Sequence, residues 1–178
     1  MPLSFPTADD AALIADSIEG RREAFDQLFD RYYNAIHTFA HRLCLNSADA
    51  DDIAQETFVK AARGLATYRG GDFRSWLLRI AANTFRDQWR AAARRGRMET
   101  EAAEALAAEG CAQSTAADRV RDALGTLPED QRAAVALVYF EGLNHAEAAR
   151  VLGCAETTVS WRIFRARRQL KQILTEPS

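Results

Sequence analysis

Prolines are confined to the two ends and one interior position of this sequence, and that distribution most constrains its fold. The four prolines stand at positions 2, 6, 128 and 177, so residues 7–127 contain none. Proline interrupts helices because it lacks an amide N–H and clashes with the preceding turn. Alanine is abundant and no long alternation of β-branched residues occurs, which also favours helix. We expect an all-α fold with helices near 8–19, 21–44, 48–64, 72–94, 118–125, 129–141, 145–152 and 156–174.

Residues 95–117 differ in composition from the rest of the chain. They are rich in Ala and Glu, contain Gly96 and Gly110, and have almost no large apolar side chains. Such a segment buries too little apolar surface to pack as part of a core. The sequence therefore predicts a flexible linker between two small helical domains, residues 1–94 and 118–178.

The overall composition is that of an ordinary globular protein. Of the 178 residues, 48% are hydrophobic and 27% are charged. No apolar run approaches the roughly 20 residues of a membrane span, and the N-terminus has no secretory signal pattern, so we expect no membrane insertion. The cysteines Cys44, Cys111 and Cys154 are odd in number and far apart, which argues against a disulfide framework and favours a cytoplasmic location.

The net charge of −2 hides two concentrated basic blocks. Residues 63–97 contain nine arginines and two acids, and residues 157–178 contain five basic residues and one acid. Residues 98–118 between them contain five acids and no base. This pattern indicates two polyanion-binding surfaces on an otherwise acidic chain.

The last part of the sequence has the pattern of a helix-turn-helix. A short apolar-patterned helix near 145–152 is followed by Gly153, which tolerates the positive φ of a sharp turn, and then by a longer helix from about 156. On that longer helix Val159, Ile163, Ala166, Leu170 and Ile173 form one apolar stripe.

The opposite face of that helix holds two large aromatic residues among basic and hydroxyl side chains, an arrangement that suits a DNA major groove. A basic helix packed on another protein is the alternative. The residues of this face are Thr157, Trp161, Phe164, Arg165 and Arg168, with Ser160 and Lys171 at its edge.

The helix near 72–94 carries a second basic stripe. Arg79, Asn83, Arg86 and Arg90 follow one another at i, i+4, i+7 and i+11, and Trp76 precedes them on the same face. Arginine holds a backbone phosphate, an aromatic ring stacks on a base and an amide bonds a base edge, so the stripe suits single-stranded nucleic acid. The alternative is a solvated arginine face with Trp76 buried. Leu77, Leu78, Ala81, Phe85 and Trp89 on the remaining circumference are expected in the core.

The loop 67–73 before this helix has glycines that would let its backbone curl around an extruded base. Its residues are Thr67, Tyr68, Arg69, Gly70, Gly71, Asp72 and Phe73. Upstream, Asp49, Asp52 and Glu56 form an acidic stripe with Gln55 beside it. The stripe either favours the helix dipole or forms a docking face for a basic partner.

No catalytic or cofactor motif is evident. The sequence has no phosphate-binding loop, nucleophile elbow or HExxH motif, so we expect neither an enzyme nor a cofactor. His37, His41 and Cys44 fall on one helix face at a spacing that could bind a metal, although packing is the more common role of such residues.

Several of these motifs occur in an order that resembles one known family. They are the acidic helix 49–58, Tyr-Arg-Gly at 68–70, the segment 73–83, Leu-Pro-Glu at 127–129, Gly-Leu at 142–143 and the helix 158–167. In these motifs the chain resembles bacterial sigma factors of the extracytoplasmic-function (ECF) group over about residues 20–174. The resemblance implies sigma regions 2 and 4, binding to core RNA polymerase, and promoter-specific transcription initiation.

The resemblance also implies roles for particular residues. Asp49, Asp52, Gln55 and Glu56 would contact the β′ clamp helices of the polymerase, whose β flap is a second expected contact. The minus-ten non-template strand would be read by Tyr68, Arg69, Gly70, Asp72, Phe73, Trp76, Arg79, Asn83, Arg86 and Arg90. The minus-35 duplex would be read by Thr157, Ser160, Trp161, Arg162, Phe164, Arg165, Arg167 and Arg168.

One departure from the family pattern and one alternative reading remain. Housekeeping sigma factors have two adjacent tryptophans where this chain has Trp76 and Leu77, which implies weaker strand opening and stricter promoter choice. An anti-sigma factor is the usual regulator in the family. The alternative reading is a helix-turn-helix regulator with a ligand-binding or dimerising N-terminal domain, although such a domain has no need of the arginine stripe on 72–94.

Overall fold

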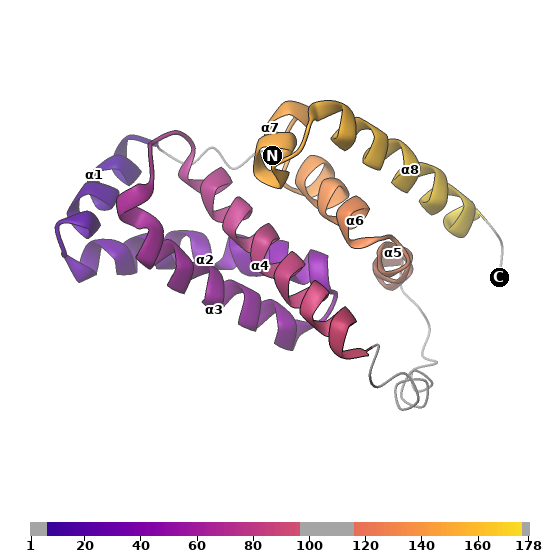
Figure 1. Ribbon diagram of the computed structural model, residues 1–178, viewed down its shortest axis with the longest axis horizontal. Coiled ribbons are helices and arrows are strands. Elements are labelled where there is room, and N and C mark those ends of the chain that lie inside the picture. The colour runs from indigo at the N-terminus through magenta and orange to yellow at the C-terminus, as the bar shows by residue number, and fades with distance from the viewer. Residues whose placement is uncertain (1–6, 97–115, 176–178) are drawn as a thin grey trace.

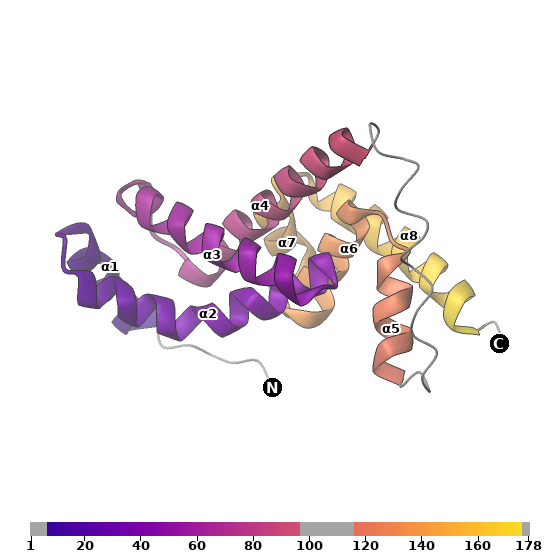
Figure 2. The same ribbon diagram turned by 90° about the horizontal axis from the view of Figure 1, so that it is seen from below.

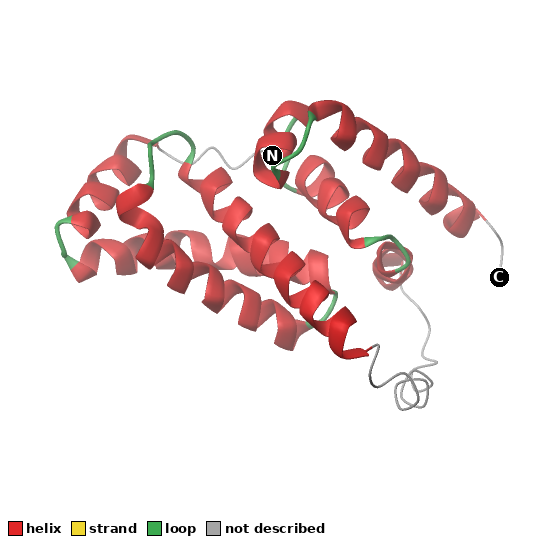
Figure 3. Cartoon of the chain, viewed as in Figure 1, coloured by secondary structure: helices red, strands yellow, loops and turns green. Residues whose placement is uncertain are grey.

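The computed structural model describes residues 7–96 and 116–175. Within these ranges the chain consists of helices and short connections and has no β-strand (Figure 3). The prediction of an all-α fold is confirmed. Most of the predicted linker, residues 97–115, lies outside the described residues, as does Cys111.

The N-terminal domain consists of four α-helices and one 3₁₀ turn. The apolar residues of helix 22–44 recur every three or four positions and are buried, which is why that helix packs centrally against its neighbours. These elements are α1 (Thr7–Ile18), α2 (Arg22–Cys44), α3 (Ser47–Gly64), η1 (Leu65–Thr67) and α4 (Phe73–Gly96).

Side-chain caps stabilise the starts of α3 and α4. The Asn46 side chain accepts a hydrogen bond from the Asp49 amide at 2.9 Å, which satisfies one of the free N–H groups at the start of α3. The Asp72 carboxylate accepts from the Ser75 amide at 2.9 Å in the same way at the start of α4. A buried Asp10 side chain accepts from the Tyr32 hydroxyl and joins α1 to α2.

The C-terminal domain contains the predicted helix-turn-helix. Helix α7 (His145–Leu152) begins with a capping box of Asn144 and Glu147 and ends at Gly153, whose φ of 64° is left-handed. Helix α8 (Glu156–Thr175) follows directly. The expected role of Gly153 as the turn residue is confirmed. The domain begins with α5 (Ala116–Gly125), α6 (Glu129–Val135) and η3 (Ala136–Phe140).

The segment 136–140 differs from the continuous α-helix expected over 129–141. Its last turn is a π-helix, in which the Glu141 amide donates to the Ala136 carbonyl at 3.0 Å, five residues earlier. The hydrogen-bonded loop contains one residue more than that of an α-helix, which changes the direction in which the following side chains point. The pattern of apolar residues does not predict such a turn because an α-turn would bury nearly the same side chains.

The two domains pack against each other along helix α4. Figures 1 and 2 show α7 beside α4, and the C-terminal end of α2 close to α6. Buried side chains from both domains belong to one apolar cluster. None of the described helices is long and apolar enough to span a membrane.

Candidate nucleic-acid interface

The loop 67–73 and the start of α4 form one wall of a cleft. The cleft has a volume of about 810 Å³, and Tyr68, Arg69, Gly70 and Asp72 line it together with Trp76. Gly70 and Gly71 have φ values of 86° and 100°, so the loop uses the backbone freedom expected of it. The Tyr68 hydroxyl donates to the Gly71 carbonyl at 2.6 Å and stabilises the curl of the loop.

An aromatic cluster supports this loop from below. The ring centroids of Tyr68 and Trp76 are 5.3 Å apart, and that of Phe73 is 5.5 Å from Tyr68 and 5.4 Å from Trp76. Phe73 is only 3% exposed, so this candidate base contact lies in the core, below the cleft surface. Trp76 is half-buried, which leaves part of its ring at the cleft.

The arginine stripe on α4 is present, but its members are not equivalent. Arg79, Asn83 and Arg90 are exposed, and Arg79 and Asn83 also line the cleft. Arg86 is half-buried; it donates to the Asn83 side-chain oxygen, and at 3.4 Å to the Leu152 carbonyl. The structure therefore brings together the loop and the stripe that sequence analysis treated as neighbouring parts of one site.

One expected core residue of α4 is exposed. Leu77, Leu78, Ala81 and Phe85 are buried as expected, but Trp89 is 41% exposed. The guanidinium of Arg132 lies 5.5 Å from the Trp89 ring centroid. Trp89 thus lies at the edge between the two domains, a position that helical periodicity alone does not reveal.

The acidic stripe on α3 divides into exposed and paired residues. Asp52 and Gln55 are exposed. Glu56 accepts from Lys60 at 2.8 Å and from Gln88 of α4 at 3.0 Å, which lowers its pKa because the ionised form gains donors. Asp49 accepts a side-chain hydrogen bond from Asn46 within the helix cap.

Sequence reasoning missed one residue on this face of α3. Val59 is 47% exposed and follows Asp52 and Gln55 at i+7 and i+4, so the three share one side of the helix. An exposed valine beside acidic and amide groups adds apolar contact area to a docking face. The spacing of Val59 from Asp52 and Gln55 is visible in the sequence and could have placed it on this face.

The exposed face of α8 matches the sequence prediction in its large residues. Trp161 and Phe164 are 56% and 63% exposed, while Val159 and Ala166 on the opposite face are fully buried. Thr157, Arg165, Arg167 and Arg168 are also exposed, and the Arg165 guanidinium lies 5.4 Å from the Trp161 ring centroid.

Two residues predicted on this face have other contacts. The Arg162 side chain is 14% exposed and pairs with Asp130 of α6, so it ties α8 to its own domain. Ser160 is exposed and its hydroxyl lies 2.9 Å from Nδ1 of His145, which links the two helices of the motif.

An apolar groove of about 1050 Å³ runs between α5, η3 and α8. Its lining includes the exposed rings of Tyr139, Phe140 and Phe164 and the basic residues Arg167 and Arg168. Sequence analysis placed Phe140 among the apolar residues of its helix and did not predict the groove, because the π-turn sets the orientation of the two η3 rings.

His37, His41 and Cys44, whose spacing could bind a metal, are not gathered into a site. His37 pairs with Asp51 at 3.0 Å, and the Cys44 thiol donates to the carbonyls of Ala40 and Asn46 at 3.1 Å. Burial raises the pKa of the Cys44 thiol. In the part of the chain that the structure describes, no three His, Cys, Asp or Glu side chains are placed to hold a metal ion.

A helix-turn-helix with an exposed aromatic and basic helix, next to a domain with an arginine-lined cleft, defines a two-domain DNA-binding transcription factor. The families described as "Sigma-70 region 2" and "Sigma-70, region 4" match residues 28–95 and 117–170. The chain belongs to the ECF group of sigma-70 factors.

Similar proteins carry the same family name. The chain is 40% identical over 93% of its length to the ECF RNA polymerase sigma factor SigM of Mycobacterium tuberculosis strain H37Rv, of which 84% is covered. It is 34% identical over 99% of its length to the ECF sigma factor SigE of Mycolicibacterium smegmatis, of which 71% is covered.

Two solved structures share the fold. CnrH in complex with the cytosolic domain of CnrY matches with a TM-score of 0.71 and 33% identity over 96% of this chain and 99% of that chain. The sigma factor RpoE of Bartonella quintana in complex with the anti-sigma factor NepR matches with a TM-score of 0.69 and 30% identity, over 86% and 98% of the two chains.

Proposed function

We propose that this protein binds core RNA polymerase and directs it to promoters that have minus-ten and minus-35 elements. The N-terminal domain captures the minus-ten non-template strand in the cleft that the loop 67–73 and α4 line. Helix α8 enters the major groove of the minus-35 element. The observation that carries the proposal is that each domain presents one arginine-rich surface with aromatic residues, one suited to a single strand and one to a duplex.

The proposed polymerase contact on the N-terminal domain is the exposed face of α3. Asp52 and Gln55 supply charge and hydrogen-bonding groups, and Val59 supplies apolar area. We assign this face to the β′ clamp helices of the polymerase. The C-terminal domain supplies the second contact, to the β flap.

The remaining parts of the proposal concern location, catalysis and control. The protein acts in the cytoplasm and is not itself an enzyme, because the polymerase performs the chemistry. CnrH and RpoE were solved with a partner protein, and for RpoE that partner is an anti-sigma factor. We propose that an anti-sigma factor also controls this protein.

Run-off transcription on fragmented genomic DNA tests the function directly. Purified core polymerase is assayed with and without this protein, and the RNA 5′ ends are mapped. Discrete starts that share two upstream elements and require the protein are the expected result. Absence of such starts, together with tight binding of the protein alone to duplex DNA, would instead support the helix-turn-helix regulator.

A further inference from the structure

Two polar side chains of α4 lie in the cleft one turn apart. Arg79 and Asn83 are both exposed and both line it. A guanidinium only donates hydrogen bonds, whereas an amide can present either its oxygen or its NH2 group. The group that the cleft recognises therefore depends on which end of the Asn83 amide faces it.

The neighbouring Arg86 determines the direction of that amide. Its guanidinium donates to the side-chain oxygen of Asn83, three positions earlier on the same helix. Because a guanidinium has no acceptor atom, the amide atom that faces it must be the oxygen. The Asn83 oxygen is therefore occupied, and the NH2 group is the end of the amide that is left for a ligand in the cleft.

Arg86 is itself held by acceptors within the protein. Its Nε donates to the Ala82 carbonyl at 3.4 Å, and its Nη1 donates to the Leu152 carbonyl, also at 3.4 Å. The side chain is half-buried, unlike the exposed Arg79 and Arg90 of the same stripe. A guanidinium with three protein partners has few donors left for a phosphate, so Arg86 differs from the role expected of the stripe.

Nucleobases differ in the group that would meet this donor. Thymine and guanine have a keto oxygen where cytosine and adenine have an exocyclic amine. A keto oxygen accepts from the amide NH2 group. An amine in the same place would bring two donors together and leave both without a partner, which costs free energy in a site away from water. A captured base with a keto oxygen is thus favoured beside Asn83.

We infer that Arg86 is a positioning residue, which holds the Asn83 amide with its NH2 group toward the captured base, so that the cleft selects a keto base over an amino base. This inference rests on the proposed function, because it treats the cleft as the site of the minus-ten strand. Asn83 contacts the base, and Arg86 acts through Asn83. Arg86 then contributes to base preference and not to the phosphate contacts that set the salt dependence of binding.

The test measures binding of fluorescent single strands by the complex of core polymerase with the full chain. The strands carry the minus-ten sequence mapped by run-off transcription, and each position is changed in turn. Uracil is compared with cytosine and hypoxanthine with adenine, because each pair exchanges a keto oxygen for an amine. At one position the wild type should bind the keto member of at least one pair at least tenfold more tightly.

Two substitutions at Arg86 separate positioning of the amide from packing. Arg86→Lys keeps a group that only donates and can hold the amide oxygen, so the keto preference should remain. Arg86→Met keeps the aliphatic stem without donors, so the amide can turn over and the preference should fall to about threefold or less. A merely structural role of Arg86 would lower the melting temperature and leave the ratio of the two affinities unchanged.

Asn83→Asp reverses the chemistry of the contact with the base. A carboxylate has nearly the shape of the amide but only accepts, so the amino member of each pair should now bind more tightly than the keto member. This variant changes an exposed side chain, so it keeps the test decisive if Arg86→Met fails to fold.

Arg90→Met is the matched control, since it removes a guanidinium from an exposed position of the same stripe. It should weaken binding of keto and amino strands alike. It should also lower the slope of log affinity against log salt by about 0.7, the value for one phosphate contact on a single strand. Arg86→Met should leave that slope unchanged.

The possible outcomes separate this inference from the proposed function. Equal affinity for keto and amino bases at every position, or a preference for amino bases, would overturn the inference and leave strand binding intact. A keto preference that Arg86→Met does not change, or that Asn83→Asp does not reverse, would overturn it as well. Failure of the complex to bind any strand would refute the proposed function, and this inference with it.

Discussion

At the scale of single residues, burial decides which charged side chains are available to a partner. Arg162 and Arg165 lie three positions apart on α8, yet Arg162 is 14% exposed and paired with Asp130, whereas Arg165 is exposed beside Trp161. Both were predicted to contact DNA. Only Arg165 is placed to reach a groove in the described arrangement.

Replacement of Trp161 and Arg162 should separate these roles. Trp161→Ala removes an exposed ring, so minus-35 binding by the holoenzyme should fall at least tenfold with little change in stability. Arg162→Ala breaks the pair with Asp130 and should lower the free energy of unfolding by about 1 kcal/mol. Promoter-binding assays and urea unfolding measure the two effects, and the reverse pattern would contradict the assignment.

Substitutions in the acidic stripe on α3 should likewise separate an effect on polymerase binding from an effect on stability. Asp52→Lys reverses an exposed charge and should weaken binding to core polymerase at least tenfold without a change in melting temperature. Glu56→Lys also removes the acceptor of Lys60 and Gln88, so it should lower both polymerase affinity and stability. A competition assay measures the affinity for core polymerase. If Asp52→Lys binds as tightly as the wild type, the exposed face of α3 is not the polymerase contact.

At the scale of elements, helix α4 has three faces with different contacts. One side buries Leu77 and Leu78, a second carries Arg79 and Asn83 along the cleft, and Gln88 bonds α3. A 24-residue helix has room for these functions because its faces point in different directions. Substitutions on α4 should therefore have effects that depend on the face.

Asn83→Ala tests the cleft face. Loss of the amide should reduce transcription from minus-ten-dependent promoters at least tenfold while core polymerase binding stays the same, because the residue is exposed and lines the cleft instead of the docking face of α3. Abortive transcription and a polymerase pull-down measure the two properties. Equal losses in both would refute the role.

The contact between α3 and α4 through Glu56 should depend on pH. Hydrogen bonds from Lys60 and Gln88 lower the pKa of Glu56 from its ordinary value of 4.5, so the ionised form stabilises the folded state above that pH. This contribution is lost as the pH falls through the lowered pKa. Glu56→Gln should cost less than about 0.5 kcal/mol at pH 7, since the group is partly exposed, and nothing at low pH. Urea unfolding at several pH values measures the difference in the free energy of unfolding between Glu56→Gln and the wild type. A difference that stays constant with pH would show that ionisation of Glu56 is not its cause.

At the scale of the whole molecule, a shared core makes the two domains one structure. The apolar cluster contains residues from both, and Gly125 lies so close to α2 that an added Cβ would be 3.3 Å from Leu45. Tight packing of this kind couples the stabilities of the domains.

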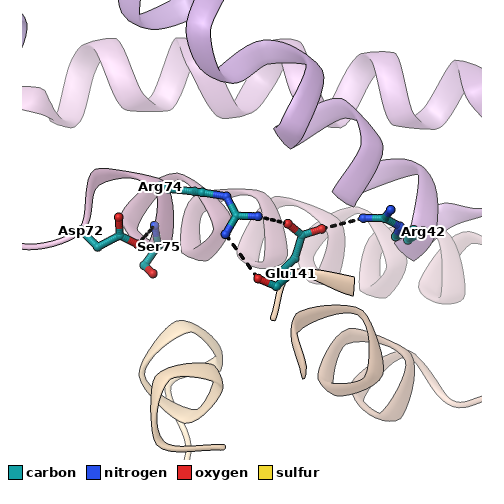
Figure 4. A network of polar contacts seen from close by, with 5 residues as sticks. All are labelled: Arg42, Asp72, Arg74, Ser75 and Glu141. Atoms are coloured by element: carbon teal, nitrogen blue, oxygen red, sulfur yellow. Dashed lines mark hydrogen bonds and ion pairs between the residues drawn. The ribbon is translucent and has the colours of Figure 1, made fainter. Parts of the chain in front are cut away.

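Calorimetry should detect that coupling. The wild type should unfold in one cooperative transition, because separation of the domains exposes apolar surface in both. Glu141→Arg breaks the ion pairs that join Glu141 to Arg42 of α2 and Arg74 of α4 (Figure 4), so it should unfold in two transitions or one broadened transition. Glu23→Arg makes the same charge change at an exposed site of α2 and should behave as the wild type. Two resolved transitions in the wild type would show that the shared core contributes little cooperativity.

Sequence reasoning predicted the helices and the turn at Gly153 because local periodicity and glycine chemistry determine them. It also predicted that Trp161 and Phe164 are exposed, since they oppose an apolar stripe. It could not predict the contact of α7 with α4, the ion pairs of Glu141 with Arg42 and Arg74, or the exposure of Trp89. These depend on residues far apart in sequence, such as Arg42 and Glu141, whose pairing no local pattern encodes.

Arg86 has a consequence for how promoter preference can evolve. It contacts both Asn83 and the end of α7, so a substitution there changes two equilibria together. Selection for a new minus-ten base would also change how tightly α7 packs against α4, and a later substitution at the domain contact would have to restore that packing. Lineages that diverge in the promoters they read are therefore expected to diverge at Glu141 and its two arginines as well.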